Sequence, residues 1–319
     1  MGGISVAKWA AFWLLGIIWG SSFLLIRVGV EELNPFQVVF MRTGIAAVGL
    51  NLVLALRGRH LPLNWRAMLP LIVLGIGNTT MPFVLISWGE TSIDSGLASV
   101  LNATAALFTL VIAHFTFADE RITIKKIVGV VIGFAGVVVL ASRNWVDGQL
   151  MTGGLLGQLA IVGASLCYAI FGVYSRKVIQ NRFDPLTVST GAMTFAALTS
   201  GILMLLSPML GGQPLVAVTD MSSDVLIAMI LLGLVNTFIA YLMFYWVIAG
   251  LGAARASMVT YVVPVIGLTL GAIVLNETID ARLLLGAGMI FVGILIVNLR
   301  LRALRNQRVQ PANATIAAK

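Results

Sequence analysis

The sequence predicts an all-α polytopic membrane protein with ten transmembrane helices, arranged as two inverted five-helix repeats around a central cavity. Three observations predict this class: the apolar composition, a series of ten long apolar runs, and an internal repeat. Of the 319 residues, 59% are hydrophobic and only 10% are charged, and the mean hydropathy is +1.02. A chain this apolar is not a soluble globular protein, so we expect much of its surface to face lipid.

Ten apolar runs are each long enough to cross the hydrocarbon core of a bilayer, which takes about 20 helical residues. They cover residues 9–28, 36–56, 67–88, 95–116, 126–142, 154–175, 186–207, 223–248, 254–275 and 283–301. The first run is of full length and lacks a small-residue cleavage pattern, so we expect no cleaved signal peptide. Residues 302–319 are polar and are expected to form a disordered cytoplasmic tail.

The second half of the chain repeats the first at a nearly constant offset. Phe117, Glu120, Lys125, Gly129 and Gly136 are answered 157 residues later by Val274, Glu277, Arg282, Gly286 and Gly293. Leu74, Gly75, Asn78, Thr79 and Trp88 are answered 158 residues later by Leu232, Gly233, Asn236, Thr237 and Trp246. We therefore assign one five-helix repeat to 9–142 and a second to 153–301. Because five is odd, the repeats enter the membrane from opposite sides, as in many secondary transporters.

The positions of the basic residues predict the orientation of the chain. Lys and Arg gather in the loops on one side, whereas the other side carries only Arg27, Arg143 and Arg282. By the positive-inside rule, both termini lie in the cytoplasm. The net charge of +8 is thus a property of short membrane loops and does not indicate a nucleic-acid partner. With one Cys and two His, we expect no disulfide frame, no metal site and no cofactor.

Each half closes with an acidic residue followed by a helix with regularly spaced glycines. The first half has Glu120 and Arg121 before Gly129, Gly133 and Gly136, and the second has Pro264 and Glu277 before Gly286 and Gly293. With Trp19-Gly20-Ser21-Ser22 and Arg42, these motifs resemble the drug/metabolite transporter superfamily, in its ten-helix branch built from two EamA-type domains. The resemblance covers about 11–141 and 154–300, and within the branch the chain is similar to the YddG-type exporters of aromatic and other amino acids.

The resemblance implies a multi-pass transporter of the bacterial cytoplasmic (inner) membrane. Two departures from the family pattern are visible. Leu107 stands where the family often has a proline like Pro264, and Arg42 has no basic partner in the run 186–207. The two halves are therefore not expected to be functionally interchangeable.

Uncharged polar residues form stripes at helical spacing on six of the apolar runs, three in each half. One such residue more often holds two helices together, but stripes on six helices predict a shared cavity. The cavity candidates are Trp19, Ser22, Asn78, Ser99, Asn102, Tyr168, Asn236, Tyr241 and Tyr261.

Charged residues near the spans are few. Arg42 lies inside an apolar run, where an arginine is costly and usually faces a partner or a cavity. It could contact a substrate carboxylate, but a structural bond to backbone carbonyls or to a loop acid is favoured. Glu120 and Glu277 are interpreted as structural acids that accept hydrogen bonds from free amides at helix starts. Glu90 and Asp94, in a short outer loop, are predicted to be solvated.

The sequence therefore predicts an exporter of amino acids or similar small neutral or zwitterionic metabolites that works by alternating access. No Asp or Glu lies in the middle of a span, so tight proton coupling is not expected. The partners are a small-molecule substrate and the lipid bilayer, and the chain is a monomer or weak oligomer. The alternatives are another metabolite or drug class or, less favoured, a non-transporting receptor. No catalytic constellation indicates an enzyme.

Overall fold

The computed structural model describes residues 2–118, 122–142, 153–179 and 182–298, and this part of the chain is helical without strands. Nine helical segments in it are long and apolar enough to cross a membrane, and one shorter apolar segment covers Ala281–Val297. The prediction of an all-helical, multi-pass class is confirmed, while the tenth crossing stays a prediction. Glu120 and the predicted tail lie outside the described residues.

Of these nine long segments and the shorter one, five are single uninterrupted helices, and each of the other five contains a change of helix type or a break. The uninterrupted ones are α1 (Gly2–Glu32), α2 (Pro35–Leu56), α7 (Ile124–Ala141), α9 (Pro185–Leu206) and α14 (Ala281–Asn298). The others are α3 (Trp65–Gly75) with η1 (Ile76–Thr80) and α4 (Met81–Gly89); α5 (Ser95–Asn102) with α6 (Ala105–Thr116); α8 (Gly153–Tyr174) with η3 (Ser175–Ile179); α10 (Ser223–Gly233) with η6 (Leu234–Ile239) and α11 (Ala240–Leu251); and α12 (Ala253–Ala256) with η7 (Ser257–Tyr261) and α13 (Val263–Val274).

Equivalent helices of the two halves begin with equivalent caps. Asn34 accepts a hydrogen bond from the backbone N–H of Phe36 at the start of α2, and Asp184 accepts one from Thr187 at the start of α9. Proline follows both caps, at a position where the missing N–H costs nothing. The sequence thus starts both helices in the same way, although they run in opposite directions through the bundle.

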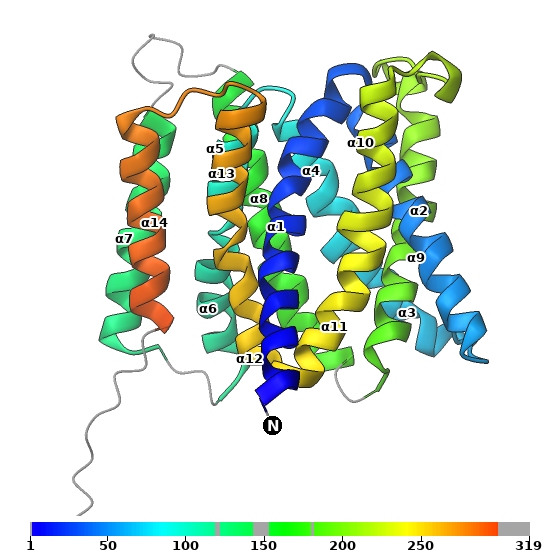
Figure 1. The fold of residues 1–319 in the computed structure, drawn as a ribbon, viewed down its shortest axis with the longest axis horizontal. Helices are drawn as coiled ribbons and strands as arrows, with labels where there is room; N and C mark the ends of the chain where they lie inside the picture. The colour runs from blue at the N-terminus through cyan, green and yellow to red at the C-terminus, as the bar shows by residue number, and fades with distance from the viewer. Residues whose placement is uncertain (1, 119–121, 143–152, 180–181, 299–319) are drawn as a thin grey trace, which may run out of the picture.

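Helices of one half pack mainly against helices of the other half, and equivalent helices make equivalent contacts. α7 packs on α14 at one side of the bundle, and α2 packs on α9 at the other (Figure 1). Between them, α8 packs on α4 and α5, and α1 makes the matching contacts with α10, α11 and α13. Each half thus contributes one helix, α1 or α8, that packs mainly against helices of the other half.

The regular spacing of glycines near the end of each half is explained by the α7–α14 crossing. A Cβ on Gly136 would lie 2.6 Å from the carbonyl oxygen of Gly286, and one on Gly129 would lie 2.6 Å from that of Gly293. Only glycine permits backbones to approach this closely. These residues hold the scaffold together.

The buried core is joined at one end of the bundle and divided at the other. At the end opposite the N-terminus, here called the far end, residues such as Ile26, Leu33, Ile93 and Met229 belong to one cluster that spans both halves. Toward the N-terminal end this cluster continues along α14 to Ile294, and three separate clusters lie between α1 and α11, between α2 and α9, and between α3 and α9. The structure is therefore closed by apolar packing at the far end.

Candidate functional site

Two crossings widen into π-helix at equivalent positions near the middle of the bundle. These are η1 and η6, whose first residues, Ile76 and Leu234, are partners in the internal repeat. In each, a threonine hydroxyl donates to the carbonyl five residues earlier: Thr80 to Gly75 at 3.3 Å and Thr237 to Leu232 at 2.8 Å. Short π-helical turns inside α-helices occur frequently at functional sites.

Two further crossings are interrupted nearby. α5 ends at Asn102 before α6 begins, and the 3₁₀ segment η7 precedes α13 in the second half. The hydroxyl of Ser165 on α8 donates to the carbonyls of Leu101 and Asn102, at 3.3 and 3.2 Å. The side-chain oxygen of Asn102 is buried and has no hydrogen-bond partner among the described residues. Interrupted helices at the centre of transporters commonly form substrate sites.

Arg42 lies buried between these interrupted helices, with 7% of its surface exposed. Its Nε donates to the hydroxyl of Thr237 at 2.9 Å, and its guanidinium carbon lies 3.8 Å from the centre of the Phe83 ring. Tyr168 and Tyr241 are within electrostatic range of the guanidinium. The two terminal nitrogens form no hydrogen bond to described residues. Neither a backbone carbonyl nor a loop acid holds Arg42, so the structural contact favoured from the sequence differs from the one found.

A cluster of aromatic rings from α1 and α11 extends from Tyr241. The Trp19 ring lies 6.4 Å from that of Tyr241 and 5.1 Å from that of Phe244, and Tyr241 lies 6.4 Å from Tyr245. We call Arg42 and its neighbours the arginine–aromatic site. It consists of Trp19, Arg42, Phe83, Tyr168, Thr237 and Tyr241.

The sequence identified Trp19, Arg42, Tyr168 and Tyr241 of this site but missed Phe83 and Thr237. Thr237 could have been found, because it follows Asn236 in the repeated Asn-Thr pair that begins at Asn78 in the first half. Phe83 carried no signal, since a phenylalanine in an apolar span usually meets lipid or a neighbouring helix.

Other candidate residues lie at contacts between helices. Asn236 donates to the carbonyl of Ile18 and to the hydroxyls of Ser21 and Ser22, at 2.9 and 3.1 Å for the hydroxyls, and so fastens η6 to α1. The hydroxyl of Ser99 donates to Gly96 at 2.7 Å, within the contact between α5 and α13.

Two candidates are only partly buried. Asn78 lies within η1, and Tyr261 is the last residue of η7, where it packs against the large cluster at the far end. No contact in the described structure joins either residue to Arg42. Their role in binding stays a prediction.

Glu277 caps a helix of the other half. Its carboxylate accepts from the N–H and the hydroxyl of Ser95, both at 2.7 Å, and from the N–H of Gly96 at 2.9 Å. A carboxylate at this position complements the positive end of α5. From the sequence, Glu277 was expected to cap the helix that follows it along the chain. In the structure Glu277 caps α5 instead. The matching residue, Glu120, lies outside the described residues.

The predicted solvation of Glu90 is wrong. Glu90 immediately follows α4, and none of its surface is exposed. The loop before α5 is held down by a hydrogen bond from the Arg27 guanidinium to the backbone carbonyl of Glu90. Sequence could not show this, because a loop acid looks solvated until the covering helices are placed. Asp94 is partly buried.

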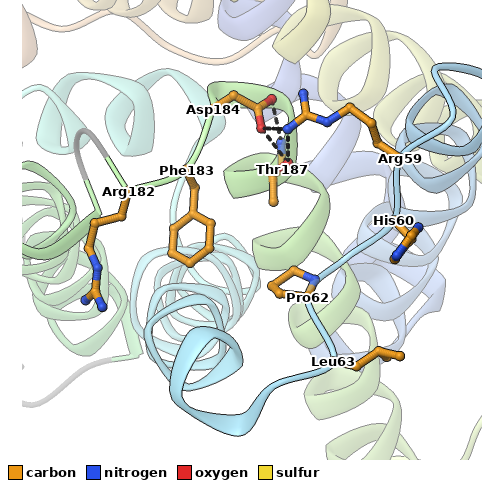
Figure 2. A pocket seen from close by; sticks show the side chains of 8 residues that line it. All are labelled: Arg59, His60, Pro62, Leu63, Arg182, Phe183, Asp184 and Thr187. Carbon is orange, nitrogen blue, oxygen red and sulfur yellow. Dashed lines mark hydrogen bonds and ion pairs between the residues drawn. The ribbon is translucent and has the colours of Figure 1, made fainter.

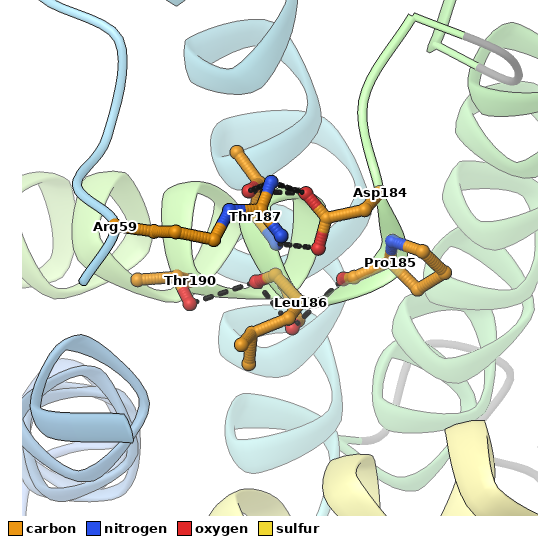
Figure 3. Close-up of polar contacts among 7 residues, drawn as sticks. Arg59, Asp184, Pro185, Leu186, Thr187 and Thr190 are labelled. Atoms are coloured by element: carbon orange, nitrogen blue, oxygen red, sulfur yellow. Dashed lines mark hydrogen bonds and ion pairs between the residues drawn. The ribbon is translucent and has the colours of Figure 1, made fainter. Parts of the chain in front are cut away.

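A polar pocket of about 380 Å³ lies at the N-terminal end of the bundle. Figure 2 shows its lining, which comes from the loop after α2 and the start of α9: Arg59, His60, Pro62, Leu63, Arg182, Phe183, Asp184 and Thr187. Arg59 and Asp184 form an ion pair at 2.5 Å, and Thr187 donates to the same carboxylate at 2.6 Å (Figure 3). Partial burial opposes ionisation, but the hydrogen bonds from Thr187 and Arg59 lower the pKa of Asp184. This pair joins the two halves, well away from Arg42.

Comparisons with known proteins place this architecture. The EamA-like transporter family matches residues 8–142 and 155–299. "Uncharacterized inner membrane transporter YedA" of Escherichia coli K12 is 30% identical over 91% of this chain and 90% of its own length. "Probable terminal-alkyne amino-acid exporter" of Streptantibioticus cattleyicolor is 29% identical over 97% and 98%. A crystal structure with 19% identity superposes with a TM-score of 0.65 over 94% of this chain and 99% of that one, which shows the shared fold.

Proposed function

The chain belongs to the EamA-like transporter family, and from this premise we propose that it exports amino acids or similar small zwitterionic metabolites across the bacterial inner membrane. Transport proceeds by alternating access between the two five-helix halves, without tight proton coupling. The relatives that are named as an inner membrane transporter and an amino-acid exporter support the location and the substrate class.

The arginine–aromatic site is the observation that carries this proposal. Burying a guanidinium in a membrane protein is costly unless a partner or a cavity compensates it. Arg42 is held by Nε alone, so its terminal nitrogens keep the planar donor fork that binds a carboxylate through two parallel hydrogen bonds. Trp19, Tyr168 and Tyr241 offer ring faces and edges to a side chain. The site thus matches a carboxylate joined to an apolar or aromatic group.

The ammonium group of an amino acid needs an acceptor, and Asn102 offers one. Its side-chain oxygen is the buried, unpartnered acceptor at the break between α5 and α6. An amide oxygen can accept a charge-assisted hydrogen bond without adding a negative charge to the membrane. Arg42 and Asn102 together would therefore select a zwitterion over a simple acid.

The orientation follows from the loops. Arg57, Arg59, Arg66, Arg176 and Arg182 all lie at or beyond helix ends on the N-terminal side of the bundle. The positive-inside rule makes this the cytoplasmic side. The far end, closed by the joined core, then faces outward, and the described arrangement is the one that receives substrate from the cytoplasm. Exchange of the pseudosymmetric contacts would close the cytoplasmic end and open the other.

Flux in liposomes tests the proposal. Purified protein is reconstituted, and efflux of labelled aromatic and aliphatic amino acids is measured with and without an imposed pH gradient. The carboxamide of each amino acid and the corresponding decarboxylated amine serve as matched controls. We expect flux of the amino acids that ignores the gradient, and little flux of either control. Equal flux of acid and amine would contradict recognition at Arg42, and no flux of any amino acid would contradict the substrate class.

A further inference from the structure

Glu90 is a buried acid that the transport site does not use. It lies seven residues after Phe83, which is two helical turns. The two side chains therefore lie on the same side of α4, two turns apart along its axis. Phe83 lies against Arg42, and Glu90 lies at the far end. None of the Glu90 surface is exposed, and neither carboxylate oxygen has a hydrogen-bond partner among the described residues.

The charged groups around Glu90 leave its carboxylate uncompensated. From α1, Arg27 donates to the backbone carbonyl of Glu90 rather than to its side chain. From α2, Arg42 is directed to Thr237 and Phe83. From the segment between α13 and α14, Glu277 adds a second negative charge, which is already engaged in capping α5. Described residues form no ion pair with Glu90.

α8, the helix that packs against the end of α4, carries a buried uncharged acceptor close in sequence to this contact. α8 meets the end of α4 where Gly157 faces Gly89, so closely that a Cβ on Gly89 would lie 2.9 Å from the Gly157 carbonyl oxygen. The next residue on α8 is Gln158, whose side-chain oxygen is buried and also unpartnered. A carboxylate gains nothing from an open oxygen acceptor, whereas a protonated carboxyl brings a donor into a region that has one.

A buried carboxylate without a partner is so costly that the group takes up a proton instead. Burial raises the pKa of Glu90 well above its ordinary value, and the charge of Glu277 acts in the same direction, against the weaker opposing effects of Arg27 and Arg42. Burial at the closed far end therefore favours the neutral, protonated form of Glu90.

We propose that Glu90 is a proton-binding site that controls the extracytoplasmic gate: the proton stabilises the closed gate, and opening releases it to the side from which it came. The proposal rests on the alternating access of the proposed function and adds regulation by external pH. Because the proton returns to the same side, no proton crosses the membrane. This agrees with transport that lacks tight proton coupling.

The sign of the pH dependence follows from the two states. When the gate opens, water reaches Glu90 and its pKa falls toward the ordinary value of about 4.3. Between that value and the raised value of the closed state, opening requires loss of one proton. Acid therefore favours closure, and each pH unit changes the population of the open gate about tenfold. Above the raised value the dependence disappears.

A cysteine reporter on the gate tests this without any substrate. Phe23 is 5% exposed and lies one turn before Arg27 on the same face of α1. In a Cys167→Ser background, Phe23→Cys is treated with a membrane-impermeant thiol reagent from the extracytoplasmic side over a range of pH. The exposed Thr91→Cys, at the same end, corrects for the reactivity of the thiol itself.

We expect the corrected labelling rate of Phe23→Cys to rise about tenfold per pH unit up to a plateau. Adding Glu90→Gln, which mimics the protonated group, should give slow labelling that does not change with pH. Glu31→Gln removes an exposed carboxylate at the end of α1, the helix that carries Phe23. This variant should keep the pH dependence of the labelling rate. A pH-independent wild-type gate, or a Glu90→Gln gate that keeps its pH dependence, would overturn the proposal.

Infrared spectroscopy of the cysteine-free protein gives a second readout. At neutral pH we expect the carbonyl band of a protonated carboxylic acid, and its loss in Glu90→Gln. Absence of the band in the parent protein would overturn the proposal even if the variant failed to fold. Net proton movement during transport, followed with a pH dye inside liposomes, would contradict return to the same side. Labelling and infrared need no substrate, so they remain decisive if the amino-acid panel fails.

Discussion

Arg42 shows how a single side chain can serve both the structure and the transported molecule. Its Nε bond to Thr237 and its contact with Phe83 fix the direction of the guanidinium. The remaining donors are left for a ligand, so part of the cost of burying the charge is recovered only when a carboxylate binds. The sequence posed a choice between a structural and a binding role, and the geometry supports both at once.

Asn102 provides a prediction at the residue scale. Asn102→Ala removes the unpartnered acceptor proposed for the ammonium group. A hydrogen bond to a charged group is worth about 1.5–3 kcal/mol, so we expect the half-saturating substrate concentration to rise about tenfold or more. Thr109→Ala is the matched control, because Thr109 is exposed on the same crossing and donates to Ala105 within its own helix. Unchanged affinity in Asn102→Ala would show that the orphan oxygen does not face substrate.

Several candidate residues were easier to find than to interpret. Helical spacing places Ser99, Asn102 and Asn236 on polar faces, but spacing does not say whether a face meets a cavity or another helix. In the structure Asn236 is bonded to α1, and Ser99 packs in the α5–α13 contact. Glu90 was misjudged for a related reason, since burial at a loop depends on helices distant in sequence.

At the scale of elements, the sequence predicted the spans well but not their interruptions. The apolar runs are local signals, and they placed most of the helices within a few residues. The Asn and Asp caps before Pro35 and Pro185, seen in the structure, are local signals of the same kind. The π-helical segments η1 and η6 have no compositional signature, because they depend on backbone hydrogen bonds made five residues back. The internal repeat predicts the position of the second π-helical segment only once the first has been located.

The α7–α14 contact gives a prediction for an element. Gly136→Ala places a methyl group 2.6 Å from the Gly286 carbonyl, and overpacking of this kind costs about 1–3 kcal/mol. We expect a lower midpoint of thermal unfolding in detergent. The control is Gly288→Ala on the partner helix, where the added atom meets open space, so stability should be unchanged or slightly higher. Equal effects of both substitutions would contradict the close crossing.

At the scale of the whole molecule, alternating access requires the far end to open and close while the α7–α14 contact stays intact. In Gly96→Cys/Leu268→Cys, a disulfide would join α5 to α13 at the far end, where a Gly96 Cβ would lie 3.3 Å from the Leu268 Cα. We expect oxidation to stop flux and reduction to restore it.

The matched control for this cross-link lies in the scaffold. In Gly129→Cys/Ile296→Cys, a disulfide would join α7 to α14, where a Cβ on Gly129 would lie 3.2 Å from the Ile296 Cβ. Flux should survive this cross-link. Full flux with the far end cross-linked would show that α5 and α13 do not separate during transport.

Recognition of the substrate carboxylate by Arg42 can be measured by counterflow. Counterflow of an amino acid and of its carboxamide is compared in liposomes that contain either the parent protein or Arg42→Ala. We expect the parent protein to prefer the amino acid strongly and Arg42→Ala to lose this preference, because the group that recognises the charge is gone. An Arg42→Ala protein that still discriminates acid from amide would place carboxylate recognition elsewhere and contradict the role of Arg42.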